Sequence, residues 1–299
     1  MTAAELDVRG VSMQFQGLSA LTDVSLQVPP GEIHGLIGPN GAGKTTMFNC
    51  LTGFYRPTSG EVWLSGSRID GLAPHQISGA GVSRTFQNIR LFANMTAIEN
   101  ILVASHRHIG GLPAHHVPAR PSQMPVVRGA KRLLSALPGI ASGLKEVALA
   151  VSQPPPITHS ERDGIERARS LLRGVGLAGQ ENMVARNLPY GDQRRLEIAR
   201  ALATGPRLLL LDEPTAGMNP QESAAMISLI RRIRDEFDTT VVLIEHQMRV
   251  VMGVCERITV LDYGRRIADG TPAEVQRNER VIEAYLGTRA LKDGSHAAP

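Results

Sequence analysis

The stretch IHGLIGPNGAGKTT, residues 33–46, decides the fold. Its apolar first part predicts a buried strand, its glycines predict a tight turn, and apolar periodicity up to Leu51 predicts a helix after the turn. From Gly38 to Thr45 the stretch fits the pattern G-x-x-x-x-G-K-[ST]. The glycines let successive backbone N–H groups point inward as an anion nest, and the helix N-terminus adds its positive end. The sequence therefore predicts a phosphate-binding loop, and the flanking strand and helix disfavour a chance glycine-rich turn.

Two side chains of this loop have specific predicted roles. Lys44 supplies a compact positive charge for the β- and γ-phosphates, and the Thr45 hydroxyl can bind Mg²⁺. The residues predicted to contact the nucleotide are Gly38, Pro39, Asn40, Gly41, Ala42, Gly43, Lys44, Thr45 and Thr46.

An apolar strand that ends in two acids supplies the second half of a nucleotide site. Four leucines at 208–211 precede Asp212 and Glu213. Asp212 would hold Mg²⁺ directly or through water, and Glu213 would orient and deprotonate the attacking water. On its own, a pair of acids after a leucine run more often marks only the turn at the end of a strand. Together with the phosphate-binding loop, it predicts hydrolysis of a nucleotide.

The segments around these motifs alternate between strands and helices. Residues 6–28 show two alternating runs, which predict an antiparallel hairpin, and short strands are expected at 61–66 and 81–87. The apolar strands 207–213 and 240–246 are typical of a parallel sheet covered on both faces. Helices are expected at 95–107 with Thr96 as N-cap, 161–175, 190–203 and 220–236, followed by a hairpin at 256–270 and short helices at 272–277 and 279–286. The predicted class is α/β with a mostly parallel sheet.

Composition limits the remaining possibilities. The chain has 299 residues, 42% hydrophobic and 20% charged, which suits one large domain with an insertion or two domains. Cys50 and Cys255 are too few for a disulfide-built fold. No signal-peptide core and no apolar run near the roughly 20 residues of a membrane span is visible, so we expect a cytosolic chain with at most a peripheral membrane role. The net charge of +4 is only weak evidence for nucleic acid.

The segment 187–202, NLPYGDQRRLEIARAL, lies just before the acidic strand and resembles the signature sequence of ATP-binding-cassette (ABC) ATPases. Gln87 matches the family's glutamine after an edge strand. His246 matches its histidine at the end of the strand at 240–246, which follows the acidic strand. Phe15 stands where the family stacks an aromatic ring on adenine. The resemblance implies an ATPase with a RecA-like phosphate-loop core, an antiparallel β subdomain and an inserted α-helical subdomain.

Further segments resemble the branched-chain amino acid transport group of that family: NIRLF at 88–92, AGMNP at 216–220, GTPAEV at 270–275 and VIEAYLG at 281–287. The resemblance implies domain boundaries as well. The ABC domain would span 6–287, with its core at 6–93 and 204–270, its helical subdomain at 94–203, a Pro- and Gly-rich insertion at 108–160 that could hold a helix near 130–150, a C-terminal extension at 271–287 and a flexible tail at 288–299.

What the resemblance implies for mechanism is a face-to-face pair of ATPases. Each ATP with its Mg²⁺ would lie between one subunit's phosphate loop and the other's signature, here Leu188, Pro189, Tyr190, Gly191, Asp192 and Gln193. Gln87 would contact Mg²⁺ and report to the membrane subunits, His246 would contact the γ-phosphate, and Glu213 would act on water. The implied partners are a second ATPase subunit, identical or related, two transmembrane permease subunits and, indirectly, a periplasmic binding protein. The chain would lie on the cytoplasmic face of the inner membrane, with no nucleic acid.

Two residues depart from the broad family pattern. Pro189 replaces a serine of the signature, and Asn219 replaces an aspartate in the loop that crosses to the partner. Pro is tolerated at a helix start, so the fold should survive. We therefore expect the two ATP sites of the pair to be unequal.

Other interpretations stay open at this point. Another ABC system, for lipopolysaccharide export or for urea or amide import, shares much of the segment after Gln87. A soluble ABC machine would need two cassettes or a coiled-coil insertion, and neither is visible. The positive charge of the chain concentrates at 100–145, which is either a solvated loop or a strip against anionic lipid.

Overall fold

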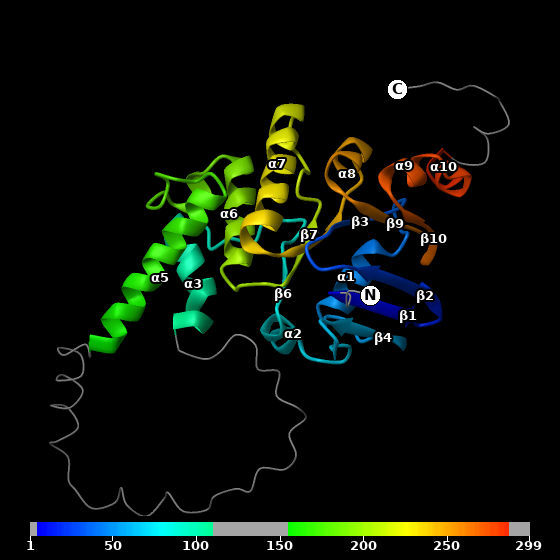
Figure 1. Ribbon diagram of the computed structural model, residues 1–299, viewed down its shortest axis with the longest axis horizontal. Coiled ribbons are helices and arrows are strands. Elements are labelled where there is room, and N and C mark those ends of the chain that lie inside the picture. The colour runs from blue at the N-terminus through cyan, green and yellow to red at the C-terminus, as the bar shows by residue number, and fades with distance from the viewer. Residues whose placement is uncertain (1–4, 110–154, 287–299) are drawn as a thin grey trace, which may run out of the picture.

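The computed structural model describes residues 5–109 and 155–286 (Figure 1). Its strands are β1 (Leu6–Phe15), β2 (Leu18–Val28), β3 (Ile33–Ile37), β4 (Ser59–Leu64), β5 (Ser67–Arg68), β6 (Val82–Arg84), β7 (Leu208–Asp212), β8 (Thr240–Ile244), β9 (Arg257–Asp262) and β10 (Arg265–Gly270). Its helices are α1 (Lys44–Leu51), α2 (Pro74–Ala80), α3 (Ala97–Ile109), α5 (Pro155–Gly174), α6 (Tyr190–Leu202), α7 (Pro220–Phe237), α8 (Met248–Val254), α9 (Pro272–Gln276) and α10 (Glu279–Leu286).

Two sheets form the framework. A 4-stranded antiparallel sheet has the order β2-β1-β4-β5. A 6-stranded sheet has the order β10-β9-β3-β8-β7-β6, and its pairs are parallel apart from β9 with β10. The α/β class, the mostly parallel sheet and the N-terminal hairpin predicted from the sequence are therefore confirmed.

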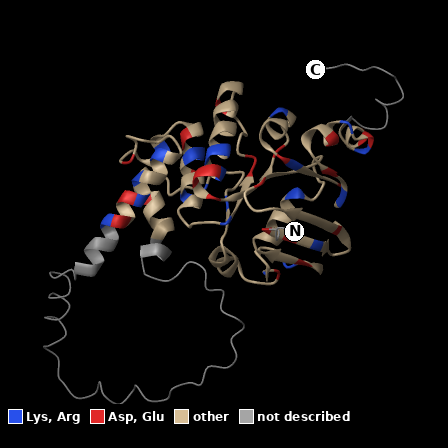
Figure 2. Ribbon diagram, viewed as in Figure 1, with Lys and Arg blue, Asp and Glu red and all other residues tan. Residues whose placement is uncertain are grey.

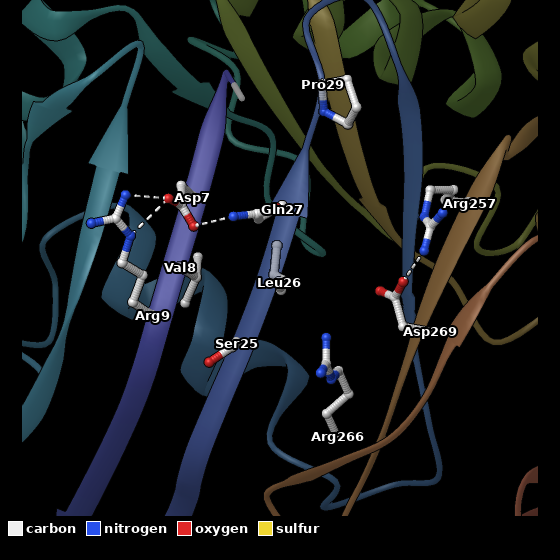
Figure 3. Close-up of a pocket in the computed structure, with 10 residues that line it drawn as sticks. All are labelled: Asp7, Val8, Arg9, Ser25, Leu26, Gln27, Pro29, Arg257, Arg266 and Asp269. Atoms are coloured by element: carbon white, nitrogen blue, oxygen red, sulfur yellow. Dashed lines mark hydrogen bonds and ion pairs between the residues drawn. The ribbon is translucent and has the colours of Figure 1, made fainter. Parts of the chain in front are cut away.

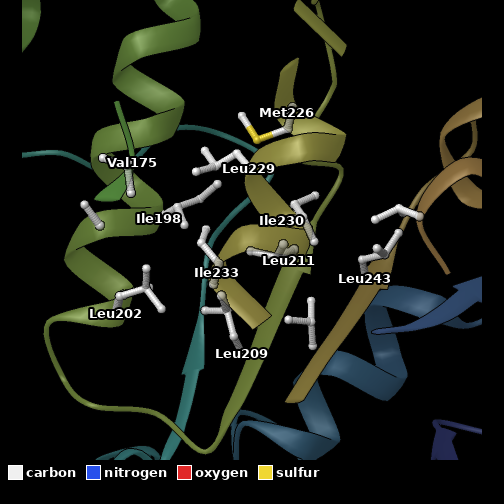
Figure 4. Packing of buried hydrophobic residues seen from close by; sticks show 14 of the residues in the cluster. Val175, Ile198, Leu202, Leu209, Leu211, Met226, Leu229, Ile230, Ile233 and Leu243 are labelled. Carbon is white, nitrogen blue, oxygen red and sulfur yellow. The ribbon is translucent and has the colours of Figure 1, made fainter. Parts of the chain in front are cut away.

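The large sheet is buried on both faces, which explains the unbroken leucines of β7. Leu209 and Leu211 pack with the apolar side chains of α6 and α7, among them Ile198 and Ile230 (Figure 4). The alternate residue Leu210 instead belongs to a cluster with α1 and the antiparallel sheet. Because successive side chains of a strand point to opposite faces, one short apolar run supports two layers at once.

A helical arm of α3, α5 and α6 lies at one side of the sheet (Figure 1). Leu171 and Leu172 of α5 and Ile101 of α3 are buried in its interior. Figure 2 shows charged residues of both signs along the part of α5 that it colours, and one pair, Glu166 and Arg169, is 2.7 Å apart. This helix is therefore amphipathic, with one apolar face that holds it to the arm.

Some expected elements differ from the structure. Helix α5 begins at Pro155 rather than at 161, because the first turn of a helix needs no N–H donors and tolerates proline. Helices α2 and α8 were not predicted, since each has only 7 residues and shows little periodicity. The helix expected near 130–150, residues 110–145 of the basic segment at 100–145, and the tail at 288–299 lie outside the described residues. The subdomain boundaries stay a prediction.

Two further expectations concern the interior and the membrane. Cys50 and Cys255 are both buried and free, so the described fold contains no disulfide between them. Across 5–109 and 155–286, no helix is at once long and apolar enough to cross a bilayer.

Candidate functional site

Four of the sequence motifs meet at one edge of the large sheet. The parallel neighbours β3, β8, β7 and β6 end at this edge, and they lead into the phosphate loop, His246, the acids Asp212 and Glu213, and Gln87. Carboxyl ends of parallel strands are where ligands bind in open α/β sheets. The sheet order therefore brings together residues that are up to about 200 positions apart in the chain.

The phosphate loop depends on glycine at two close approaches. Gly38 has φ 150°, and a Cβ there would lie 2.1 Å from the carbonyl oxygen of Leu261. Gly43 has φ 100°, and a Cβ there would lie 2.7 Å from the carbonyl oxygen of Ala20. Both contacts are too short for any side chain, so the loop can pack against β9 and β2 only with glycine at these positions.

Lys44 lies across this loop, with its ammonium turned inward. Its Nζ donates hydrogen bonds to the carbonyl oxygens of Gly38 at 2.6 Å and Pro39 at 2.9 Å. Burial lowers the pKa of Lys44, while the nearby carboxylates of Glu213 and Asp212 act to raise it. A compact cation is thus held by two backbone carbonyls and lies in the field of two carboxylates.

A cavity of about 490 Å³ opens in front of the loop. Of the predicted site residues it is lined by Asn40, Gly41, Ala42, Gly43, Lys44, Thr45, Thr46, Gln87 and Glu213. Its remaining lining residues, which sequence reasoning missed, are Leu18, Ser19, Ala20, Ile244, Tyr263 and Gly264. They come from β2, the end of β8 and the β9–β10 turn, so only the sheet order could have revealed them.

Some predicted residues do not line this cavity. Gly38 and Pro39, at the start of the loop, and Asp212 and His246, at the ends of their strands, are not among its lining residues. The Phe15 ring packs edge-on against Tyr55, with 5.1 Å between the ring centroids, and keeps 37% of its surface exposed. Phe15 is therefore accessible to a base, but the structure does not bring it to the phosphate-loop cavity.

Glu213 is the meeting point of the predicted catalytic residues. The Nε2 of Gln87 donates to its Oε2 at 3.1 Å, and Nδ1 of His246 lies 3.7 Å from its Oε1. The backbone of Glu213 has φ 49°, and its N–H donates to the carbonyl oxygen of Ile244 at 2.9 Å. A non-glycine residue in this region is strained and persists only where its surroundings hold it. Glu213 lines the cavity, where its carboxylate can accept a proton from water.

Asp212 has a partner that sequence reasoning missed. The guanidinium of Arg84 in β6 lies 2.7 Å from Oδ2 of Asp212 and donates at 2.7 Å to Oδ1 of Asn49 in α1. Both charged side chains of the pair are only 7% exposed. The rings of Phe48 and Phe86 lie 5.4 and 5.3 Å from this guanidinium. A single arginine in a short buried strand was the available signal, and its partner could not be deduced without the fold.

The signature residues lie away from this cavity, and none of Leu188 to Gln193 lines it. Leu188 is buried, whereas Pro189 and Tyr190 are exposed at the start of α6. Pro189 is the N-cap and offers no side-chain hydrogen bond. Next to it, a Cβ on Gly217 would lie 3.5 Å from the Tyr190 ring. The signature and the turn after Glu213 thus share one exposed surface.

The other departure from the family pattern has a local role. Asn219 is the N-cap of α7, and its side chain accepts from the N–H of Glu222 at 2.9 Å. The Glu222 carboxylate in turn accepts from the N–H of Asn219 at 2.9 Å, which completes a capping box.

The segment after β6 is tied to α6 by two buried side chains. Arg194 donates to the carbonyl oxygens of Phe86 at 2.7 Å and of Gln87. Glu197 accepts from the N–H groups of Phe86 at 3.4 Å and Arg90 at 3.2 Å, and burial raises the pKa of its carboxyl. Gln87 is therefore connected both to Glu213 and to the helix that carries the signature.

A second cavity, of about 440 Å³, lies between the β1–β2 hairpin and the β9–β10 hairpin (Figure 3). Its two carboxylates are already paired: Asp7 lies 2.6 Å from Arg9, and Asp269 contacts Arg257. It contains none of the predicted site residues. Among the described residues, no group of three or more His, Cys, Asp or Glu side chains could hold a metal ion.

Comparisons with known proteins agree with this geometry. A model of the ABC transporter family matches residues 21–216, and one of the branched-chain amino acid ATP-binding cassette transporters matches residues 265–290. The high-affinity branched-chain amino acid transport ATP-binding protein LivG of Escherichia coli (strain K12) is 43% identical over 96% of this chain and 99% of LivG. The corresponding protein BraF of Pseudomonas aeruginosa is 44% identical over the same shares of both chains.

A solved structure extends the agreement to the fold. The crystal structure of the ADP conformation of an ATP-binding cassette of an ABC transporter matches with a TM-score of 0.73 and 26% identity, and the match covers 96% of this chain and 100% of that one. With the phosphate loop, the acidic strand end and the signature in place, the chain belongs to the ABC transporter family of ATP-binding proteins, as an ATPase in the branch that contains LivG and BraF.

Proposed function

We propose that this ATPase energises the import of branched-chain amino acids through a membrane ABC transporter. The observation that carries the proposal is the phosphate-loop cavity with Glu213 at its wall, in a chain that matches LivG along nearly its whole length. The test is uptake of labelled leucine, isoleucine and valine in a deletion strain, with and without the restored gene. Uptake that is independent of the gene, or restored uptake of urea or an amide instead, would refute this substrate class. Lost lipopolysaccharide export with normal amino-acid uptake would refute it as well.

Lys44 and the backbone N–H groups of the loop would bind the phosphates, and Thr45 and Gln87 in the cavity, together with Asp212 at the end of β7, would hold Mg²⁺. These residues fit that ion, because Mg²⁺ takes oxygen ligands from few carboxylates and completes its shell with water and phosphate. Asp212 keeps Oδ1 without a hydrogen-bond partner among the described residues, whereas Arg84 occupies its Oδ2. Mg²⁺, when bound, would neutralise charge that develops on the phosphates.

The remaining side chains would act on the attacking water and bind the adenine ring. Glu213 would accept the proton of the attacking water, with Gln87 and His246 fixing its two carboxylate oxygens. His246 would also contact the γ-phosphate. Phe15 would stack on the adenine ring with the face that Tyr55 leaves free.

A second ATPase subunit would complete the site. Because the exposed signature lies outside its own subunit's cavity, it can serve only an ATP held by another subunit. Leu188, Pro189, Tyr190, Gly191, Asp192 and Gln193 would therefore face the phosphate loop of an identical or related partner.

The membrane subunits would contact the groove beside Gln87. This groove of about 240 Å³ lies between the core and the helical arm and is lined in part by Phe54, Ile77, Phe86 and Arg200. The chain would thus be a peripheral protein at the cytoplasmic face of the inner membrane, next to two permease subunits that a periplasmic binding protein supplies. Co-purification of a membrane subunit pair supports this arrangement, and its absence would favour a soluble ABC machine.

Restoring serine at the signature should stabilise the chain. In Pro189→Ser, the new hydroxyl can accept a hydrogen bond from the N–H of Asp192, which the proline N-cap cannot provide. An N-cap of this kind contributes about 1 kcal/mol, which urea unfolding would measure. Asn219→Ala is the matched control, because it removes an existing N-cap and should destabilise by a similar amount. No gain from Pro189→Ser would contradict the assignment of Pro189 as a defective cap.

The two ATP sites of a mixed pair should respond unequally. The ATP on Lys44 faces the partner's signature, whereas the partner's ATP faces the signature with Pro189. Lys44→Ala should therefore reduce ATPase activity of the pair more than replacing the matching lysine of the partner. Equal losses would exclude unequal sites.

A further inference from the structure

Glu245 is an acidic residue without a role so far, at the end of β8. Its side chain is fully buried, with 0% of its surface exposed, and it directly precedes His246. Within the residues that the structure describes, it forms no ion pair with lysine or arginine. A buried carboxylate without a counter-ion is costly unless hydrogen bonds satisfy its oxygens.

Hydrogen bonds from two different turns do satisfy it. Oε1 accepts from the backbone N–H of Thr215 at 3.0 Å and from the Thr215 hydroxyl. Oε2 accepts from the backbone N–H groups of His246 at 3.2 Å and, more weakly, of Gln247 at 3.5 Å. One oxygen thus holds the turn after β7, and the other holds the turn after β8.

These are the turns that carry Glu213 and His246. Thr215 stands two residues after Glu213, whose own N–H already donates to Ile244 at the end of β8. The carboxylate of Glu245 therefore closes a second connection between the same two strand ends, on the C-terminal side of the first. Two connections define an orientation, whereas one alone would leave the turns free to rotate about it.

We propose that Glu245 is a positioning residue that orients the His246 imidazole toward the Glu213 carboxylate. The Nδ1 of His246 lies 3.7 Å from Oε1 of Glu213. The inference rests on the roles given above to Glu213 and His246. Glu245 touches neither nucleotide nor water in this scheme and acts only through the two turns.

The test is a double-mutant cycle of Glu245→Gln and His246→Ala, read as ATPase activity of the purified complex. Glutamine keeps the shape but places an NH₂ group against N–H donors, which breaks one of the two connections. Because misplacing a catalytic group by about 1 Å can cost about 100-fold, kcat should fall between about 10- and 100-fold. The KM for ATP should change much less than kcat, since Lys44 and the backbone N–H groups that would bind the phosphates are left in place.

If Glu245 acts through His246, Glu245→Gln should have little further effect in the His246→Ala background. Thr240→Val is the control: it removes one partly buried hydrogen bond, from the N–H of Gly31 at 2.9 Å, at the opposite end of β8. Thr215→Val provides the same test with a smaller change, should Glu245→Gln not fold.

Additive losses, an unchanged kcat or a raised KM alone would overturn the proposal. Absent amino-acid uptake with intact ATPase activity would instead refute the proposed transport function and leave this result standing.

Discussion

Lys44→Ala should weaken nucleotide binding at this chain's phosphate loop at least about 100-fold and thereby abolish transport. The Lys44 ammonium donates to the loop carbonyls of Gly38 and Pro39 and lies in the field of Glu213 and Asp212. Its loss would remove the charge-assisted hydrogen bonds to the phosphates and leave Glu213 and Asp212 to repel them. Such bonds contribute about 1.5–3 kcal/mol each, so affinity should fall by about 100-fold or more. Titration with a fluorescent ATP analogue would measure the loss.

The matched variant is Lys44→Arg. It keeps the charge, but a planar fork cannot reproduce the two donations of a compact ammonium to Gly38 and Pro39. We expect partial binding. Thermal unfolding should show that both variants remain folded, since only two hydrogen bonds are lost. Nucleotide affinity of Lys44→Ala equal to that of the wild type would refute the assignment of the phosphate loop.

Glu213→Gln should stop hydrolysis but retain nucleotide binding. The amide keeps the shape of the side chain at its strained φ of 49° and can still contact Gln87, but it cannot accept a proton from water. Loss of a general base typically reduces turnover by about 100- to 10,000-fold. With ATP bound and uncleaved, the paired subunits should accumulate in the closed state. Single-turnover hydrolysis and size-exclusion chromatography with ATP would measure both effects.

Glu236→Gln is the control for this variant, because Glu236 is an exposed glutamate on α7 and makes the same change of charge. Its turnover should equal that of the wild type. If Glu213→Gln retained full turnover, the general base would have to be another residue.

The regular part of the fold could be predicted because local patterns determine it. The loop from Gly38 to Thr45 requires a strand before it and a helix after it, and the leucines of β7 admit only a strand covered on both faces. The start of α5 could not be predicted, because prolines mark loops as often as first turns of helices. The short α2 and α8 carry too few residues for a period to be visible.

In the candidate site, too, some residues follow from local sequence motifs and others only from the fold. Lys44, Thr45, Asp212 and Glu213 follow from motifs, because each lies within a few residues of a strand end. Arg84 and Glu245 could not be predicted, since their partners are distant in the chain: Arg84 pairs with Asp212 across 128 positions, and Glu245 binds Thr215 across 30. A buried charge in an apolar strand signals a partner, but only the sheet order identifies it.

The buried connection between α6 and the backbone after β6 has a mechanical consequence. Arg194 and Glu197 hydrogen-bond both carbonyl and N–H groups of the segment from Phe86 to Arg90. We therefore expect α6 and this segment to move as one rigid unit. A displacement of this segment, such as the proposed contact with the permease subunits would cause, should therefore move the start of α6 with it. Reporter labels on Asn88 and Arg195 should keep a constant separation through the ATP cycle, while both move relative to Thr46.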